Sequence, residues 1–187
     1  MEVVEAIRTR RSVRKYKGDP IPDQTIRELL DLAVWAPSGM NTQPWAFVVL
    51  EDREYLKNLS ERAKNFLLER LKMMPQLERY RGMLSNPDTD IFYGAPVLVM
   101  IYSSRASGTY LNDCSMAALN LMLAAWDRGI GSCWIGFASG IGNTPEVKGE
   151  LGVPEEYELV ASVILGYPAE VPAPVKREPP HILSWRK

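Results

Sequence analysis

The chain has 187 residues, 46% of them hydrophobic and 24% charged, a balance typical of a globular protein with a core of its own. Its formal net charge of −1 argues against a general attraction to nucleic acid or anionic membranes. Two cysteines are too few for a disulfide framework, and no apolar stretch reaches the roughly 18–20 residues of a membrane span. We therefore expect a cytoplasmic protein.

In chain order, the apolar spacing predicts helix, helix, strand, helix, helix, strand, helix, strand, helix and strand. The first helix is expected from Glu2 to about Arg8, and the second carries apolar residues in a helical pattern from Ile26 to Val34. The expected strands are Trp45–Leu50, Pro96–Tyr102, Gly131–Ile135 and Tyr157–Leu165.

The later helices are predicted from residues that favour helix starts, such as aspartate and serine, and from prolines and glycines that end a helix or open one. One is expected to begin at Asp52 and a separate one to run from Ser60 to about Met74, whereas Pro75–Pro87 looks irregular or only partly helical. A glycine-rich loop should follow Ile135, and Pro145 should open a helix that stops by Gly152.

The helix expected over Tyr110–Arg128 is unusual because its Cys114–Trp126 portion has almost no polar face. It should be buried on nearly all sides, or against a second subunit. The proline-rich tail after Gly166 should wrap over other structure. The uneven spacing between elements favours one α+β domain, residues 1–187, over regular βαβ winding.

Several kinds of active site have no support in the sequence. The single histidine, His181, lies in the tail, so a Ser–His–Asp triad is not expected. No cluster has zinc-ligand spacing, and the glycine-rich motifs of common nucleotide sites are missing. If the protein is an enzyme, its reactivity should therefore reside in a bound cofactor.

A basic segment is the first positive signal. Residues 8–17 read RTRRSVRKYK, and removing their six positive charges leaves −7 on the rest of the chain. Arginines with a nearby hydroxyl suit the oxygens of a phosphate, and the segment offers Arg10, Arg11, Ser12 and Arg14. A solvated patch at a helix end and a nucleic-acid contact are the alternatives.

Two further signals could serve a flat ligand. Ser38, Asn41 and Gln43 bring hydroxyl and amide groups to a turn before a strand, where they suit the edge of a heteroaromatic ring or merely cap the preceding helix. The strand in Gly131–Phe137 ends in glycine, which lets backbone approach a ligand or simply turns the chain into a loop.

Together and in this order, the three signals resemble the nitroreductase family of flavoproteins. The segments RRSVR at 10–14, PSGMNTQPW at 37–45 and 131–136 are similar to its flavin contacts, and GYP at 166–168 with KR at 176–177 is similar to its ending. The resemblance implies a mixed, mostly antiparallel sheet of about four to five strands flanked by helices. It also implies an interlocked homodimer in which the tail 167–187 wraps the partner subunit.

The resemblance further implies two FMN sites at the subunit interface. Arg10, Arg11 and Ser12 would hold the phosphate and ribityl chain, and Arg14 would face the N1/O2 edge of the ring. The ring would be approached, partly from the other subunit, by Pro37, Ser38, Gly39, Asn41 and Gln43. Ile135 and Gly136 would lie against it with a backbone N–H near N5, and Arg177 with Lys176 would return to the phosphate.

The expected activity is hydride transfer from NADH or NADPH through FMN to small acceptors such as nitroaromatics or quinones. No catalytic side chain, metal, nucleic acid or membrane is required by this scheme, because positioning and electrostatics perform the catalysis. The alternatives are a flavin-binding module with a carrier or regulatory role, and a family branch that acts on flavin itself or on halogenated aromatics.

Overall fold

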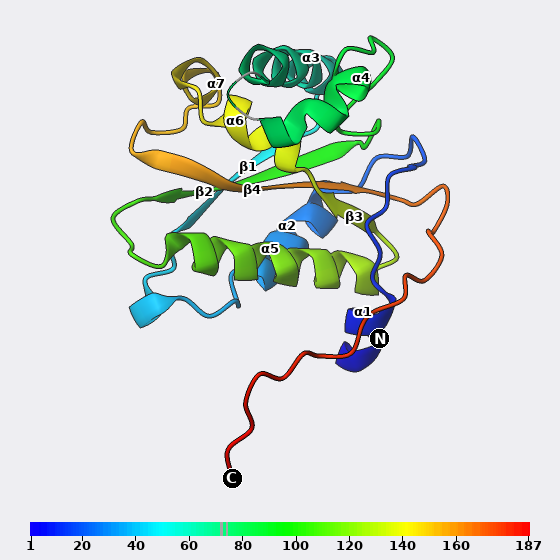
Figure 1. The fold of residues 1–187 in the computed structure, drawn as a ribbon, viewed down its shortest axis with the longest axis vertical. Helices are drawn as coiled ribbons and strands as arrows, with labels where there is room; N and C mark the ends of the chain where they lie inside the picture. The colour runs from blue at the N-terminus through cyan, green and yellow to red at the C-terminus, as the bar shows by residue number, and fades with distance from the viewer. Residues whose placement is uncertain (72, 74) are drawn as a thin grey trace.

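The computed structural model describes residues 1–71, 73 and 75–187, so the expected helix end at Met74 lies outside the described residues (Figure 1). Four strands form one sheet in the order β1-β2-β4-β3, and every neighbouring pair is antiparallel. The strands are β1 Trp45–Leu50, β2 Val97–Ser104, β3 Gly131–Trp134 and β4 Tyr157–Gly166. All four lie within two residues of the ranges expected from the sequence.

Helices cover both faces of this sheet, as Figure 1 shows. One face carries α1 Val3–Thr9, α2 Asp23–Ala33 and α5 Tyr110–Asp127. The other carries α3 Arg53–Arg70, α4 Arg81–Leu84, α6 Ser139–Gly142 and α7 Pro145–Glu150. Short 3-10 turns complete the elements at η1 Gly39–Asn41, η2 Pro75–Tyr80 and η3 Gly136–Ala138. The α+β class is confirmed.

Alternation along the central strand β2 divides the core between the two faces. Val97, Val99 and Ile101 pack with α2 and α5, whereas Leu98 and Met100, which point the other way, pack with α3 and α6. Each of these residues is fully buried. An unbroken apolar run therefore marks a strand covered on both faces.

Two expectations about the helices were wrong. Residues after Asp52 form the single helix α3, because the Ser60 hydroxyl does not cap a new helix; it accepts a hydrogen bond from the backbone N–H of Ile91 at 3.0 Å. The glycine-rich segment after Ile135 folds into η3 and α6 instead of an open loop. There the missing side chain of Gly140 leaves room for Phe66 of α3, so the glycines permit close helix packing.

Helix α5 is only partly covered within one chain. Its inner face is fully buried, but Leu111 and Leu119 on the outer face remain about half exposed, at 51% and 50%. A single subunit therefore does not bury this helix on nearly all sides. Of the two expectations for α5, burial against a second subunit stays a prediction. None of the described helices combines the length and apolar character needed to cross a membrane.

The two ends of the chain run side by side at the β3 edge of the sheet (Figure 1). The segment after α1 forms an isolated parallel bridge between Ser12 and Ser132 and continues antiparallel to the start of the tail, where Tyr16 pairs with Pro168. Backbone bonds from Lys17 to Tyr167 and from Ala169 to Lys15 close this pairing at 2.8 and 2.9 Å. The pairing brings the proline-rich tail back over the basic segment.

Candidate functional site

A basic hollow of about 490 Å³ lies where the N-terminal segment meets the tail. Its wall contains five of the residues singled out from the sequence: Arg10, Arg11, Ser12, Arg14 and Arg177. Ile7 and Arg8 of α1 and two apolar tail residues complete the wall, and none of the described residues that line it is acidic. An excess of guanidinium groups around a concave space attracts an anion.

Arg10 carries the clearest electrostatic signature in this hollow. One terminal nitrogen of its guanidinium group, Nη1, is buried and has no hydrogen-bond partner among the described residues, and the same holds for Nε of Arg11. Burial and the nearby positive charges of Arg177 and Arg11 lower the pKa of Arg10. Since buried charged donors are normally paired, these two nitrogen atoms make the hollow a candidate site for an anion.

A second hollow of about 520 Å³ adjoins the first and shares Arg14 with it. It is lined by aromatic rings from four parts of the chain: Phe66, Tyr80, Tyr93, and the neighbouring Trp134 and Phe137. Cys133, Ile135 and Gly136 form its floor at the end of β3. Burial raises the pKa of the Cys133 thiol, which therefore stays neutral. Such an aromatic cavity fits a planar ring.

The end of β3 offers one free backbone donor to this ring hollow. The N–H of Ile135 is used in the sheet, where it bonds to the carbonyl of Ser162 at 2.8 Å. The N–H of Gly136 has no partner among the described residues. A side chain added at Gly136 would meet nothing within 4 Å, so the space above this peptide is open.

The turn at 37–43 lies elsewhere in the chain, at the opposite end of α5. The Gly39 N–H donates to Asp113 near the start of α5, whereas α1 is attached near its end, where Trp126 bonds to Thr9. Thirteen residues of helix separate Asp113 from Trp126, which corresponds to about 20 Å. Figure 1 shows the two regions at opposite ends of the helix.

The turn is nevertheless shaped as if to present its polar groups. Met40, Asn41 and Gln43 all have positive φ angles, between 46° and 55°, which non-glycine residues adopt at some cost. The Ser38 hydroxyl accepts the Gln43 N–H, and the Gln43 amide donates to Asn41. These bonds stabilise a strained and exposed turn, a combination common at binding sites.

One chain therefore brings together part of the predicted site. Arg10, Arg11, Ser12, Arg14 and Arg177 share the basic hollow, and Ile135 and Gly136 lie in the ring hollow beside it. Pro37, Ser38, Gly39, Asn41 and Gln43 are not joined to either hollow within the chain. Lys176 is exposed, lies 3.5 Å from Glu178, and lines neither hollow.

Sequence reasoning missed the aromatic wall. Tyr93 stands over Arg14, with the guanidinium carbon 5.8 Å from the ring centroid. A positive φ of 57° bends the chain at Tyr93, and Asp90 holds the bend by accepting backbone N–H groups at 2.8 Å. The aspartate three positions before the Tyr93-Gly94 pair was the available signal, because such a pattern favours a capped turn.

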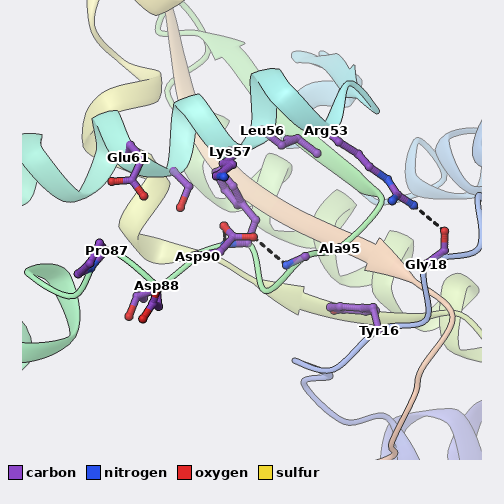
Figure 2. Close-up of a pocket in the computed structure, with 14 residues that line it drawn as sticks. Tyr16, Gly18, Arg53, Leu56, Lys57, Glu61, Pro87, Asp88, Asp90 and Ala95 are labelled. Atoms are coloured by element: carbon purple, nitrogen blue, oxygen red, sulfur yellow. Dashed lines mark hydrogen bonds between the residues drawn. The ribbon is translucent and has the colours of Figure 1, made fainter.

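Another cavity, of about 480 Å³, lies between α3 and the loop at 87–95 (Figure 2). Arg53 on its rim donates to the Gly18 carbonyl at 2.6 Å, and Glu61 is paired with Lys64 at 2.8 Å. Both oxygens of Asp90 accept backbone N–H groups of their own loop. Because the protein satisfies these charged groups itself, we assign the candidate site to the two hollows that share Arg14.

The fold and these hollows define a class: an α+β protein with a basic hollow beside an aromatic one. Comparison with known proteins specifies it further. The model of the nitroreductase family matches residues 7–167. A protein of Methanothermobacter thermautotrophicus whose name combines NADH dehydrogenase and NAD(P)H nitroreductase is 31% identical over 176 residues, 92% of this chain and 80% of that protein.

Two further matches cover nearly the whole chain. The NADH dehydrogenase of Thermus thermophilus is 30% identical over 193 residues, 95% of this chain and 92% of that protein. A crystal structure of a nitroreductase with bound FMN from Bacteroides fragilis superposes with a TM-score of 0.84 at 31% identity, covering 100% of this chain and 98% of that one. The chain belongs to the nitroreductase family.

Proposed function

We propose that this protein is an FMN-dependent oxidoreductase that passes hydride from NADH or NADPH to small acceptors such as nitroaromatics or quinones. The single observation that carries the proposal is the pair of hollows that share Arg14. One contains buried guanidinium nitrogens without a hydrogen-bond partner among the described residues, and the other is lined by aromatic rings. A phosphorylated planar cofactor needs both environments side by side. The FMN in the related Bacteroides fragilis structure supports the same assignment.

The residues of the basic hollow would hold the phosphate. Arg10, Arg11 and Arg177 supply charge-assisted donors, and Ser12 supplies a hydroxyl, so Nη1 of Arg10 and Nε of Arg11 would gain an acceptor. Lys176 is the least supported phosphate contact, because it lines neither hollow. Proximity of Arg177 depends on the pairing of the tail with residues 15–17.

The residues of the ring hollow would orient the ring. Arg14 would place its guanidinium group where negative charge develops, at the N1/O2 edge. The free N–H of Gly136 would approach N5, with Ile135 packed beneath the ring. Aromatic side chains on the other wall would exclude water from the reacting face once the ring is bound.

We further propose a homodimer in which each site takes residues from both subunits. Support comes from the turn at 37–43, which lies too far along α5 to reach the hollows of its own chain. It also comes from the half-exposed Leu111 and Leu119 on α5 and from Leu183 and Trp185 in the tail, which are 88% and 73% exposed. Residues 167–187 would extend over the partner, and the remainder would act as one domain.

Bound FMN would supply the two-electron chemistry by accepting hydride at N5 and giving it to the acceptor. With a nitroaromatic, NAD(P)H and one proton are consumed, and NAD(P)⁺, the nitroso compound and water are formed. Arg14 and the Gly136 N–H perform the protein's part, since hydride transfer needs no side-chain acid or base. Two free, buried thiols, Cys114 and Cys133, are consistent with a cytoplasmic protein.

The proposal is tested by spectroscopy on purified protein and on Arg10→Ala. Wild type should bind FMN, turn yellow, and bleach when NADH or NADPH is added without air. Arg10→Ala should bind FMN about 10- to 100-fold more weakly, the usual worth of a buried charge-assisted bond, while its weak affinity for riboflavin, which has no phosphate, should be unchanged.

The alternatives give different results. A protein that takes up no FMN contradicts the proposal. Flavin that binds but stays oxidised under excess nicotinamide would favour a carrier or regulatory module. Salt-sensitive DNA or RNA binding that Arg10→Ala removes, with flavin irrelevant, would favour the nucleic-acid interpretation of the basic segment. Turnover against flavin and halogenated aromatics would identify a different branch of the family.

A further inference from the structure

The ring hollow has a strongly one-sided charge. Two arginines, Arg14 and Arg79, line it, and none of the described residues in its wall is an aspartate or glutamate. Arg14 is assigned above to the ring edge of the cofactor. Arg79 has no such role in the proposed site, so its charge faces whatever else enters the hollow.

Arg79 is also left without a carboxylate of its own. The neighbouring Glu78 is held by Arg81 through two hydrogen bonds, to Oε1 and Oε2 at 2.5 and 3.0 Å. Among the described residues, Arg79 makes no ion pair and no side-chain hydrogen bond. Its side chain is exposed, at the open side of the hollow. A guanidinium group in this position retains its full capacity for a bidentate anion.

Aromatic stacking fixes where that guanidinium group lies. Its carbon is 4.7 Å from the centroid of the Tyr80 ring, and Tyr80 packs edge-on against Phe137 with centroids 5.1 Å apart. Phe137 follows Gly136, whose open N–H marks the reacting part of the hollow. The chain Arg79–Tyr80–Phe137 therefore holds a positive charge at a set position relative to the floor at the end of β3.

We propose that this hollow selects planar aromatic acceptors that carry an anionic substituent, and that Arg79 is the residue that determines this specificity. The inference rests on the proposed function and narrows it. The aromatic ring of the acceptor would stack between the cofactor and the wall of Tyr80 and Phe137, and its carboxylate or phenolate would meet Arg79 at the mouth. The contact is a charge-assisted bond of limited strength, because the mouth is open to solvent.

The test compares acceptors that differ only in charge: 4-nitrobenzoate and the neutral 4-nitrobenzamide. Arg79→Gln should lower kcat/KM for the anion about three- to tenfold, mainly through KM, and leave the amide within about twofold. Arg79→Lys should keep part of the selectivity, and Arg79→Glu should reverse it. In wild type the preference should weaken as ionic strength rises, and in Arg79→Gln it should not.

Binding and control measurements separate this inference from the proposed function. Calorimetry with benzoate and benzamide, which are not reduced, should show benzoate selectivity in the flavin-loaded wild type and none in Arg79→Gln. Arg27→Gln removes one exposed positive charge from α2, on the opposite face of the sheet, and should retain the selectivity.

Three results would overturn the inference: equal losses with both acceptors, loss of selectivity in Arg27→Gln, or an effect of Arg79→Gln confined to cofactor reduction by NADH. If wild type reduces neither nitro compound, the proposed function fails, and the benzoate and benzamide binding comparison still decides the role of Arg79.

Discussion

At the scale of single residues, the position of the arginines depends on a contact between Val13 and Gly131. Val13 is fully buried between Ser12 and the exposed Arg14, and its N–H bonds to the carbonyl of Ser132 at 3.0 Å. A side chain on Gly131 would lie 2.7 Å from Val13 and 3.0 Å from Pro168. One glycine therefore sets how closely the basic segment and the tail approach β3.

We predict that Gly131→Ala destabilises the protein by about 1–3 kcal/mol, the usual cost of overpacking, and weakens FMN binding because Ser12 and Arg14 are displaced. Urea unfolding and flavin titration measure the two effects. Gly149→Ala is the matched control: its added carbon meets nothing within 4 Å, and it lies inside α7. That variant should be neutral or stabilised by up to about 1 kcal/mol. Equal behaviour of the two variants would contradict the packing argument.

At the scale of elements, polar contacts attach α7 to α3 behind the ring hollow. Glu150 on α7 accepts hydrogen bonds from Arg62 at 2.9 Å and from the Tyr55 hydroxyl at 2.8 Å. These bonds lower the pKa of Glu150 below its usual 4.5. Burial and Glu150 raise the pKa of Tyr55 to about 12, so the tyrosine remains a donor throughout the physiological range.

The depressed pKa of Glu150 implies a stability term with a definite pH dependence. The folded protein prefers the ionised carboxylate, so the contribution is fully present above pH 4.5 and is lost as pH falls through the lower, folded-state pKa. Glu150→Gln should cost about 0.5–1 kcal/mol at pH 7, allowing for solvent screening, and progressively less below pH 4.5. Urea unfolding of wild type and Glu150→Gln at pH 7 and at a pH below 4.5 checks this prediction. A stability difference between the two proteins that grows on acidification would contradict it.

Elements were predictable where one rule dominated. Strands β2 and β4 are apolar runs bounded by turn residues, and α5 is a long and nearly all-apolar run that ends before Gly129, so their ranges followed from pattern alone. Ser60 could be read locally as a helix start, and only a distant partner, the N–H of Ile91, makes it a mid-helix residue. The same limit applies to α6, whose Gly140 fits against Phe66 of α3, about seventy positions earlier in the chain.

At the scale of the whole molecule, the site could be predicted only in pieces. Arg10–Arg14 and Gly136 were found because charge and glycine leave local signatures. The aromatic wall was missed, because Tyr80, Tyr93 and Phe137 become neighbours only after folding. That the turn at 37–43 and the arginines lie at opposite ends of α5 also could not be read from their order in the sequence.

We predict that Leu119→Arg, on the exposed face of α5, separates the proposed dimer and releases FMN. Sedimentation velocity should show a shift towards the mass of one chain, and the flavin absorbance of the protein peak should fall. Asn58→Arg, which adds the same charge to an exposed position of α3 on the other face of the sheet, should leave both unchanged. A dimer that persists in Leu119→Arg with its flavin retained would contradict the proposed interface.

The length of α5 has a consequence for how the protein must be handled. In the proposed dimer, each FMN site takes one wall from the turn at 37–43 of the other subunit, because about 20 Å of α5 separates this turn from the hollows of its own chain. FMN binding then depends on the concentration of the protein, through the dimerisation equilibrium. Diluting a yellow stock towards the dissociation constant of the pair should shed pigment and activity in parallel, and reconcentration with added FMN should restore both.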